Sequence, residues 1–216
     1  MAKKSKNNSS SRAYLTFEKK IERSLNLIVL QKPTESIIKA SQTTSQVDSF
    51  DLLRAALVLG VAAMDSYFTD VFAERFIPYL RERGPNKAMV SLLENAGLGT
   101  ETALKIMTMK RPYRRIRTLV EESLEKKVTQ TTNVIDDLFL AFDLRNFTKH
   151  IAELKRRKTL LKSIRNAVNR RHKIAHEGDI NSHGNLNPIT RRDVEHKLKD
   201  IVHFVSGADQ ILQSQI

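Results

Sequence analysis

The stretch from Leu52 to Met64 constrains the fold of this chain more than any other part of the sequence. Its apolar run from Ala55 to Met64 is about ten residues long, far short of the roughly 20 that a membrane-spanning helix needs. The apolar residues cover most sides of a helix, which predicts a buried central helix in an all-α protein. No segment shows convincing alternation of apolar and polar residues, so strands are not predicted.

The ends and the packing of this central helix can also be read from the sequence. Asp48 or Ser49 is expected to cap its start, and Pro78 is expected to end or kink it. The small residues at 62–63 allow a neighbouring helix to approach closely. A carboxylate is costly to bury without a partner, so Asp65 is expected to pair with an arginine or lysine in a structural role.

Apolar residues recur at helical spacing along most of the remaining chain and predict further helices. Pro33 is expected to stop the first of these, leaving a loop rich in Ser, Thr and Gln at 34–46. A single basic helix is expected from His150 to Ala175, ending at Gly178, and Thr190 begins the last helix with a capping-box-like pattern. The predicted helices lie at about 13–31, 86–96, 100–109, 112–127, 133–144, 150–175 and 190–213.

The charge of the chain bounds its choice of partners. It has 37 Lys and Arg against 24 Asp and Glu, which gives a formal net charge of +13. Such an excess attracts polyanions, so nucleic acid is the first candidate partner and an anionic membrane surface a weaker second. The chain has no cysteine, which excludes disulfides and thiolate metal sites and fits a reducing cytoplasm.

The length of 216 residues suits one domain with a substantial core. Residues 1–12 are mostly Lys, Asn and Ser without apolar periodicity, and we expect them to form a disordered basic tail. They lack the apolar core and the cleavage site of a secretory signal. Residues 13–216 are predicted to form a single all-α domain, with a mid-chain helical insertion at about 84–130.

Near the end of the basic helix, Arg171 and His176 combine two side chains that suffice for phosphodiester chemistry without a metal. An arginine holds a phosphate in a bidentate fork, and a histidine exchanges a proton near neutral pH. The helix is expected to fray or end near Gly178, so that His176 can swing back toward the arginine. The alternative is a basic helix terminus in which both residues only complement the helix dipole.

The same spacing occurs twice more, so the spacing alone is a weak signal. Arg191 and His196 lie inside one predicted helix and would point to different faces, facing solvent. Arg145 and His150 sit at a junction between predicted helices and are a second choice.

A metal site is the other chemistry to consider in this segment. His172 and His176 are four residues apart, as in helical zinc sites, and His183 is a possible third ligand. However, Lys173 follows His172 where the metalloprotease pattern has a glutamate, and the neighbouring cations repel a divalent ion. We therefore predict no metal and no other cofactor.

Basic residues in two clusters are predicted to bind RNA, because lysine and arginine neutralise phosphates and release counterions. One cluster lies on the helix that carries the motif. The other surrounds Tyr113, whose ring could stack on a base. For either cluster the alternative is an ordinary solvated helix face. The predicted RNA-binding residues are Arg157, Lys158, Lys162, Arg165, Arg170, Lys173, Arg114 and Arg115.

The segment from Arg170 to Asp179, RRHKIAHEGD, resembles the arginine–x(4–6)–histidine signature of HEPN domains, most closely the RiboL-PSP-type group. The stretch from Leu53 to Tyr67 is similar to the early helix of that group. The likeness extends over about 48–214. It implies an all-α, HEPN-like helical bundle with a central buried helix, usually a homodimer whose two motifs meet at the subunit interface.

The resemblance also implies an activity, because many HEPN proteins cut RNA without a metal and many serve in toxin–antitoxin or antiviral defence. On this reading Arg171 holds the scissile phosphate and His176 is the general acid or base toward the ribose 2′-hydroxyl or the leaving oxygen. His172 orients the pair. Such cleavage leaves a 2′,3′-cyclic phosphate, and DNA is not a substrate because it lacks the 2′-hydroxyl.

Two other functions remain open from the sequence. One is a non-catalytic HEPN-like module that binds RNA or a partner protein, such as an antitoxin or a defence-system component. The other is a helical protein whose charge attracts acidic proteins. A membrane is not an expected partner.

Overall fold

The computed structural model describes residues 10–40, 49–125 and 129–216 of the chain. Within these ranges it is helical and contains no strand, apart from one isolated β-bridge between Ile180 and Leu186. The prediction of an all-α fold is confirmed. The helices are α1 (Arg12–Ala40), α2 (Asp51–Arg83), α3 (Lys87–Asn95), α4 (Thr100–Met107), α5 (Pro112–Glu125), α6 (Thr132–Phe139), the short 3-10 helix η1 (Leu140–Phe142), α7 (Phe147–Leu154), α8 (Leu160–Glu177) and α9 (Arg191–Gln215).

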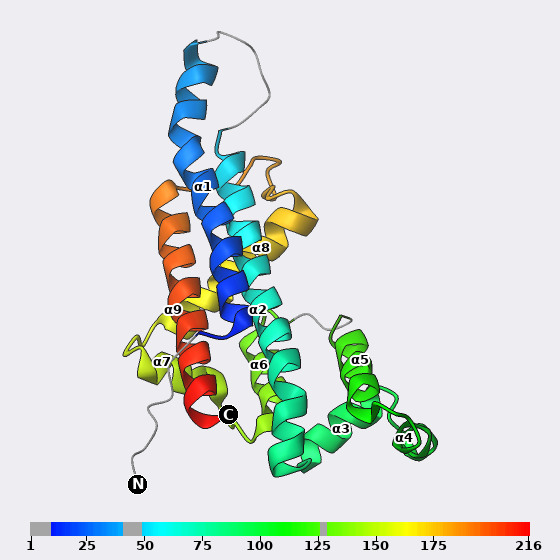
Figure 1. Cartoon of the computed structure of the whole chain (residues 1–216). Helices are drawn as coiled ribbons and strands as arrows, with labels where there is room; N and C mark the ends of the chain where they lie inside the picture. Colours follow the sequence, from blue (N-terminus) through cyan, green and yellow to red (C-terminus); the bar gives the residue numbers. More distant parts are fainter. Residues whose placement is uncertain (1–9, 41–48, 126–128) are drawn as a thin grey trace.

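The long helix α2 is the centre of the molecule (Figure 1). α1 packs along it, and both α8 and α9 contact it as well. α6, η1 and α7 close the bundle around its second half, while α3, α4 and α5 extend to one side as an arm. The predicted buried central helix is therefore present, and the arm corresponds to the segment read from the sequence as an insertion.

Close contact of three helices occurs at Gly60, in the middle of α2. A Cβ atom placed there would lie 2.1 Å from Cδ2 of Leu198 on α9 and 3.3 Å from Oγ of Ser24 on α1. Leu198 and Ser24 are both fully buried. The absence of a side chain at Gly60 thus lets α1 and α9 pack directly against the backbone of α2.

Aromatic rings fill the core below this contact. Tyr67, Phe68 and Phe72 of α2 are buried. The rings of Phe68 and Phe72 pack edge-on against Phe139 of α6, Phe68 also packs tilted against Phe204 of α9, and Tyr67 packs edge-on against Phe68. Such pairs contribute roughly 0.5–1.5 kcal/mol each beyond the area that they bury. This aromatic layer joins the C-terminal half of α2 to the second half of the chain.

The first helix differs from its prediction at both ends. Pro33 lies inside α1, which continues to Ala40, so the predicted loop at 34–46 is helical as far as residue 40; residues 41–48 lie outside the described residues. The hydroxyls of Thr34 and Ser36 donate to the carbonyls of Leu30 and Lys32, one turn earlier, and support the helix around the proline.

The start of α1 revises the boundary of the predicted tail. Residues 1–9 lie outside the described residues, but Ser11 is buried and Arg12 is already helical. The hydroxyl of Ser11 donates to Asp209 of α9, and the hydroxyl of Tyr67 donates to the same carboxylate at 3.2 Å. This buried polar contact ties the beginning of α1 to the end of the chain.

Helix α2 begins and ends later than predicted. Its N-cap is Phe50, which provides no side-chain cap; Ser49 precedes the cap, and Asp48 lies outside the described residues. The helix also continues through Pro78 to Arg83. By length and composition α2 could cross a membrane, contrary to the sequence prediction. However, 56% of its most apolar 18-residue stretch is buried inside the bundle, as expected for a core helix.

The predicted basic helix at 150–175 is in fact two helices. α7 ends at Leu154, and α8 begins at Leu160 after a turn in which Arg156 has a φ of +51°. The predicted caps at Thr190 and Gly178 are present: Thr190 accepts from the amide of Asp193, and Gly178 ends α8 in the left-handed conformation. At the start of α6, Thr131 likewise accepts from the amide of Val134. The break lets α7 and α8 each contact α9.

We predict that Gly60→Ala lowers the free energy of unfolding by roughly 1–3 kcal/mol, because the added methyl group displaces a buried leucine. In an open helix the same change is stabilising by up to about 1 kcal/mol. Urea denaturation followed by circular dichroism measures the difference. Gly99→Ala is the control, since nothing lies within 4 Å of the added Cβ at that position. Equal stability of the two variants would contradict the proposed close contact.

Candidate functional site

The motif residues lie in the last two turns of α8, and the helix remains regular through them. It continues to Glu177, and Gly178 then caps it by donating its amide to the carbonyl of Lys173. Residues five apart in a helix are turned by about 140°. The expectation that His176 swings back toward Arg171 at a frayed end is therefore wrong, and within one protomer the two side chains leave the helix in different directions.

Arg171 lies on the inner side of α8. The buried residues Leu160, Ile164 and Ala167 precede it at helical spacing, and Ile174, packed against the core, follows it. The Nε atom of Arg171 is buried and, among the described residues, has no hydrogen-bond partner. Buried polar atoms in native proteins are normally satisfied, so an orphaned one calls for a water, an ion or a ligand.

The two motif histidines lie together on the outer side of the helix. His172 and His176 are both exposed, and their ring centroids are 4.6 Å apart with planes inclined at 44°. The two rings are neighbours because residues four apart lie on the same face of a helix, and the catalytic roles of His172 and His176 stay predictions. In the part of the chain that the structure describes, no group of three or more His, Cys, Asp or Glu side chains is arranged to hold a metal ion.

A buried carboxylate fixes the backbone that follows the motif. Asp179 is fully buried and has a φ of +58°. Its Oδ2 atom accepts from Nε of Arg54 on α2 at 2.9 Å and from Nη2 of Arg170 on α8 at 2.7 Å. The two arginines also donate to the carbonyl of Asn187, at 3.0 and 3.2 Å. The cluster of Asp179, Arg54 and Arg170 thus joins α2, the end of α8 and the loop before α9.

This arrangement separates two adjacent arginines by role. The guanidinium of Arg170 neutralises Asp179 and is held by loop carbonyls, so it is taken up by the fold and we no longer include it among the RNA-binding residues. Arg171, beside it, forms no ion pair with a carboxylate of the described residues. Arg54 was not identified from the sequence as the partner of Asp179; the available signal was an arginine directly before the apolar run of α2.

The remaining predicted RNA-binding residues fall into two groups. Lys158, Lys162, Arg165 and Lys173 are exposed and follow α8 from its start to its end; we call them the α8 basic surface. Arg157 lies apart from this surface, in the turn before α8; its Nη2 atom is 2.8 Å from Oδ1 of the buried Asp200, and 28% of its side chain remains exposed.

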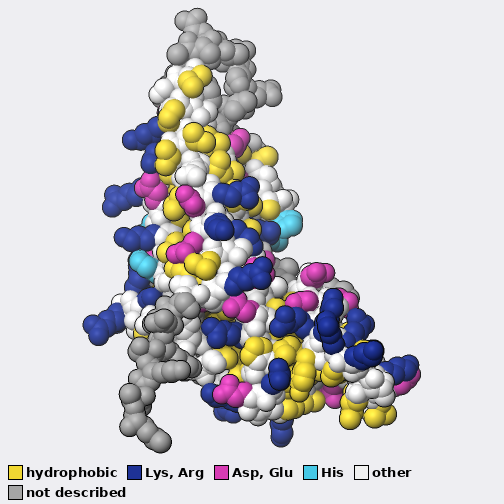
Figure 2. Space-filling view, in the orientation of Figure 1, with side chains coloured by type: hydrophobic (Ala, Val, Ile, Leu, Met, Phe, Trp, Pro, Cys, Tyr) yellow, Lys and Arg dark blue, Asp and Glu magenta, His cyan; other side chains and the backbone are white. Residues whose placement is uncertain are grey.

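The second group lies on the arm, where basic side chains gather on the face seen in Figure 2. Arg114 is exposed, and Arg115 makes a 3.7 Å ion pair with Glu122. The ring of Tyr113 is partly exposed, but the guanidinium of Arg81 covers it at 5.3 Å from the centroid. One face of that ring is therefore occupied by a cation and is not free for base stacking.

The rival arginine–histidine pairs are less suited to chemistry. Arg191 forms an ion pair with Glu195 at 2.7 Å, and Nε2 of His196 lies 3.3 Å from Oδ2 of Asp200. Each is thus engaged with a carboxylate on its own helix. Arg145 and His150 are exposed at the start of α7 and line none of the cavities described below.

Asp65 has a structural role, as predicted, but with different partners. Its carboxylate accepts from the amide of Thr129 at 2.7 Å and from Nε2 of Gln130 at 3.0 Å. Within the described residues these donors take the place of the expected arginine or lysine. The contact fixes the chain before α6 against α2.

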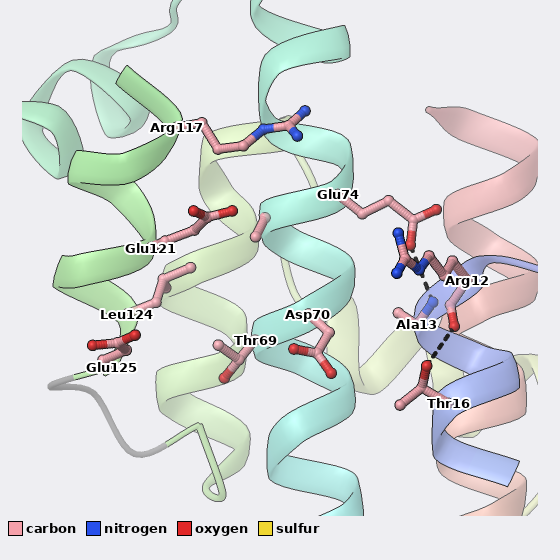
Figure 3. Close-up of a pocket in the computed structure, with 11 residues that line it drawn as sticks. Arg12, Ala13, Thr16, Thr69, Asp70, Glu74, Arg117, Glu121, Leu124 and Glu125 are labelled. Carbon is pink, nitrogen blue, oxygen red and sulfur yellow. Dashed lines mark hydrogen bonds between the residues drawn. The ribbon is translucent and has the colours of Figure 1, made fainter. Parts of the chain in front are cut away.

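A cavity of about 590 Å³ lies on another side of α2, between α1 and α5 (Figure 3). Its walls include the carboxylates of Asp70, Glu74, Glu121 and Glu125 together with two arginines. Glu74 is occupied, since it accepts from the amide of Ala13 at 3.1 Å. The excess of carboxylates repels phosphate, so we do not assign RNA binding to this cavity.

Two smaller cavities flank α8 itself. One, of about 300 Å³, is lined by Asn166, Asn169 and Lys173 together with residues of α9, and another, of about 450 Å³, by Arg165, Asn169 and the start of α6. Both adjoin the α8 basic surface. The smaller one also contains the carboxylate of Asp193, and the larger one has apolar walls from Ile164 and Val168.

Comparison with known protein families places these features in context. The RiboL-PSP-HEPN family model matches residues 19–214 of the chain. The chain belongs to the RiboL-PSP-HEPN family. The resemblance read from the sequence is confirmed, and the match includes both the Arg171–His176 motif and the arm. Neither the curated proteins nor the solved structures that were searched include a match to this chain.

Membership of this HEPN family has consequences for fold and function. It identifies the helical bundle as an all-α HEPN fold. It also indicates an RNase-like or RNA-binding function, and HEPN domains often bind RNA or dimerise.

We predict that Asp179→Asn lowers the free energy of unfolding by about 3 kcal/mol, because it removes the buried negative charge that Arg54 and Arg170 share and leaves Arg54 with the exposed Asp51 as its ion-pair partner. Urea denaturation of the purified variant measures this. Glu101→Gln is a matched control that also removes one carboxylate from an ion pair, with Lys105 at 2.6 Å, but at an exposed site worth less than about 1 kcal/mol. A variant as stable as this control would refute the role given to Asp179.

Proposed function

We propose that this HEPN protein is a metal-independent endoribonuclease in which Arg171 and His176 act on the scissile phosphate. The observation that carries the proposal is the state of Arg171. Its buried Nε atom has no hydrogen-bond partner among the described residues, whereas Nη2 of Arg170 beside it is held by Asp179 and by loop carbonyls. A guanidinium without an acceptor is suited to bind a phosphate oxyanion.

The chemistry requires only these side chains and the RNA. The 2′-oxygen bonds to phosphorus while the bond from phosphorus to the 5′-oxygen breaks, which leaves a 2′,3′-cyclic phosphate and a free 5′-hydroxyl. Arg171 stabilises the charge that develops on the phosphate. His176 removes the proton of the 2′-hydroxyl or delivers one to the leaving 5′-oxygen, solvent water carries out the other of these two proton transfers, and His172 positions the ring of His176.

The two catalytic residues are proposed to come from different subunits of a homodimer. Along one α8 helix they are turned by about 140° from each other, so one phosphate cannot readily contact both in the same protomer. In a two-fold dimer each protomer contributes the same patch, and Arg171 of one copy can face His176 of the other. The exposed position of His176 supports this arrangement.

RNA outside the reacting nucleotide is proposed to bind the α8 basic surface of Lys158, Lys162, Arg165 and Lys173. A role in toxin–antitoxin or antiviral defence, an antitoxin or defence-system partner and a cytoplasmic location remain predictions from the family resemblance. Binding of RNA without cleavage is the alternative function, and the exposed basic side chains along α8 favour it equally.

We expect the wild-type protein to cleave single-stranded RNA in excess chelator, and Arg171→Ala and His176→Ala to reduce the rate at least 100-fold. Gel analysis of labelled RNA measures the rates and detects the cyclic phosphate. His183→Ala, which removes an exposed loop histidine, is the control and retains activity. If the wild type binds RNA without cutting it, the non-catalytic function holds instead.

Mixing the two inactive variants tests whether the site is shared. In a heterodimer of Arg171→Ala and His176→Ala protomers, one of the two shared sites keeps both residues. Random exchange therefore restores about a quarter of the wild-type rate. If each site lay within one protomer, no mixture would regain activity, and sedimentation would verify that the dimers had formed.

A further inference from the structure

A second group of cations and histidines lies at the opposite end of α8 from the motif. Arg157, in the turn between α7 and α8, reaches to α9 with 28% of its side chain exposed. Its Nη2 atom forms the ion pair with the buried Asp200, and its Nη1 atom donates to Nδ1 of His203. On the other side of this carboxylate, Nε2 of His196 lies 3.3 Å from Oδ2 of Asp200.

Two lysines border the same place. Lys155 packs against Gly207 on α9, one turn beyond His203; a Cβ at Gly207 would lie 3.0 Å from its Cε. Lys199 is one turn before His203 on α9 and is exposed. Within the described part of the chain, neither the ammonium of Lys155 nor that of Lys199 forms an ion pair.

We propose that Lys155, Arg157, Lys199 and His203 form a binding site for a phosphate group. In RNA this group would be an internal phosphodiester or a terminal phosphomonoester. The site lies apart from the motif, since 16 residues of helix from Leu160 to His176 span about 24 Å. The choice of RNA as the source of phosphate rests on the proposed function, whereas the phosphate site itself does not.

The donors of this site match the acceptors of a phosphate. The guanidinium of Arg157 is paired electrostatically with Asp200, and its Nη1 atom donates to His203, so further N–H groups of its five remain for a ligand. Because Nδ1 of His203 accepts from the arginine, the neutral ring carries its hydrogen on Nε2, which is a further donor. The two lysines add flexible ammonium donors, and charge-assisted bonds to phosphate are among the strongest in proteins.

Asp200 positions Arg157 and does not neutralise the positive charge of the site. The positive charges are those of Lys155, Arg157 and Lys199, and the negative charge is that of Asp200. Together they give a net charge of two positive units when His203 is neutral. The carboxylate is only 2% exposed and lies beneath Arg157. It therefore holds the guanidinium in place, while the lysines and His203 supply the charge and donors at the surface.

The protonation of His203 provides a direct readout. Burial lowers the pKa of His203, and the nearby charges of Arg157, Lys199 and Lys155 lower it further, against an opposing effect of Asp200. A bound phosphate would reverse the balance by placing negative charge beside the ring. Phosphate is thus expected to raise the pKa of His203, with protonated His203 adding to the attraction at lower pH.

The test is a two-dimensional NMR titration of the histidine side chains of the full-length protein with inorganic phosphate, at ionic strength held constant with chloride. Saturable shifts of the His203 signals, together with a rise of its pKa, are expected. Lys199→Ala and Lys155→Ala should weaken phosphate binding about tenfold. Lys149→Ala removes an equal charge from α7, where Lys149 pairs with Glu153 at 3.9 Å, and should leave it unchanged.

Two results would overturn the site: His203 signals that do not respond to phosphate, or equal weakening in all three lysine variants, which would indicate only general attraction. RNA binding then identifies the source. If Lys199→Ala lowers the affinity for 5′-phosphorylated and 5′-hydroxyl oligonucleotides equally, the site binds an internal phosphodiester. If it lowers the affinity for the phosphorylated oligonucleotide alone, the site binds a terminal phosphate. A wild type that binds phosphate at His203 but no RNA would refute the proposed function and leave the site intact.

Discussion

The ion cluster of Asp179 with Arg54 and Arg170 is the interaction on which the functional end of the molecule depends. A fully buried carboxylate is tolerable only because two guanidiniums and the loop backbone surround it. Through it the central helix α2 fixes the end of α8 and the loop that leads into α9. It also engages Arg170, so that of two adjacent arginines only Arg171 has an unsatisfied buried nitrogen.

Helix α8 organises the chemistry of the protein between two polar ends. Its C-terminal end carries the Arg171–His176 motif, its exposed face carries lysines and arginines, and its N-terminal end adjoins the cluster of Arg157, Asp200 and His203. Both ends use a buried aspartate to hold an arginine in a defined position. The difference is that Asp179 takes up the arginines that it binds, whereas Asp200 leaves Arg157 with donors and with two neighbouring lysines at the surface.

Much of the fold could be predicted because local signals and packing agree. The apolar stretch at 52–64 forms the buried centre of the bundle. The hydroxyls of Thr131 and Thr190 cap the starts of α6 and α9, and Gly178, which has no side chain to oppose a positive φ, ends α8. The misjudged places were those where tertiary packing outweighs local preference. α1 and α2 continue through Pro33 and Pro78, while the basic segment at 150–175 breaks into two helices so that both can pack on α9.

The all-α class, the HEPN resemblance and the motif can be read from the chain alone, because helical periodicity and a short spacing of side chains are local properties. Which charged side chains remain available to a ligand depends on how the helices pack. Arg54 and Asp179 are 125 residues apart, and Arg157 and His203 are 46 apart, so their pairing depends on how α2, α8 and α9 pack. The angle between Arg171 and His176 was likewise decided by the folded helix, whose regular hydrogen bonds persist to Glu177 and keep the two side chains on different faces.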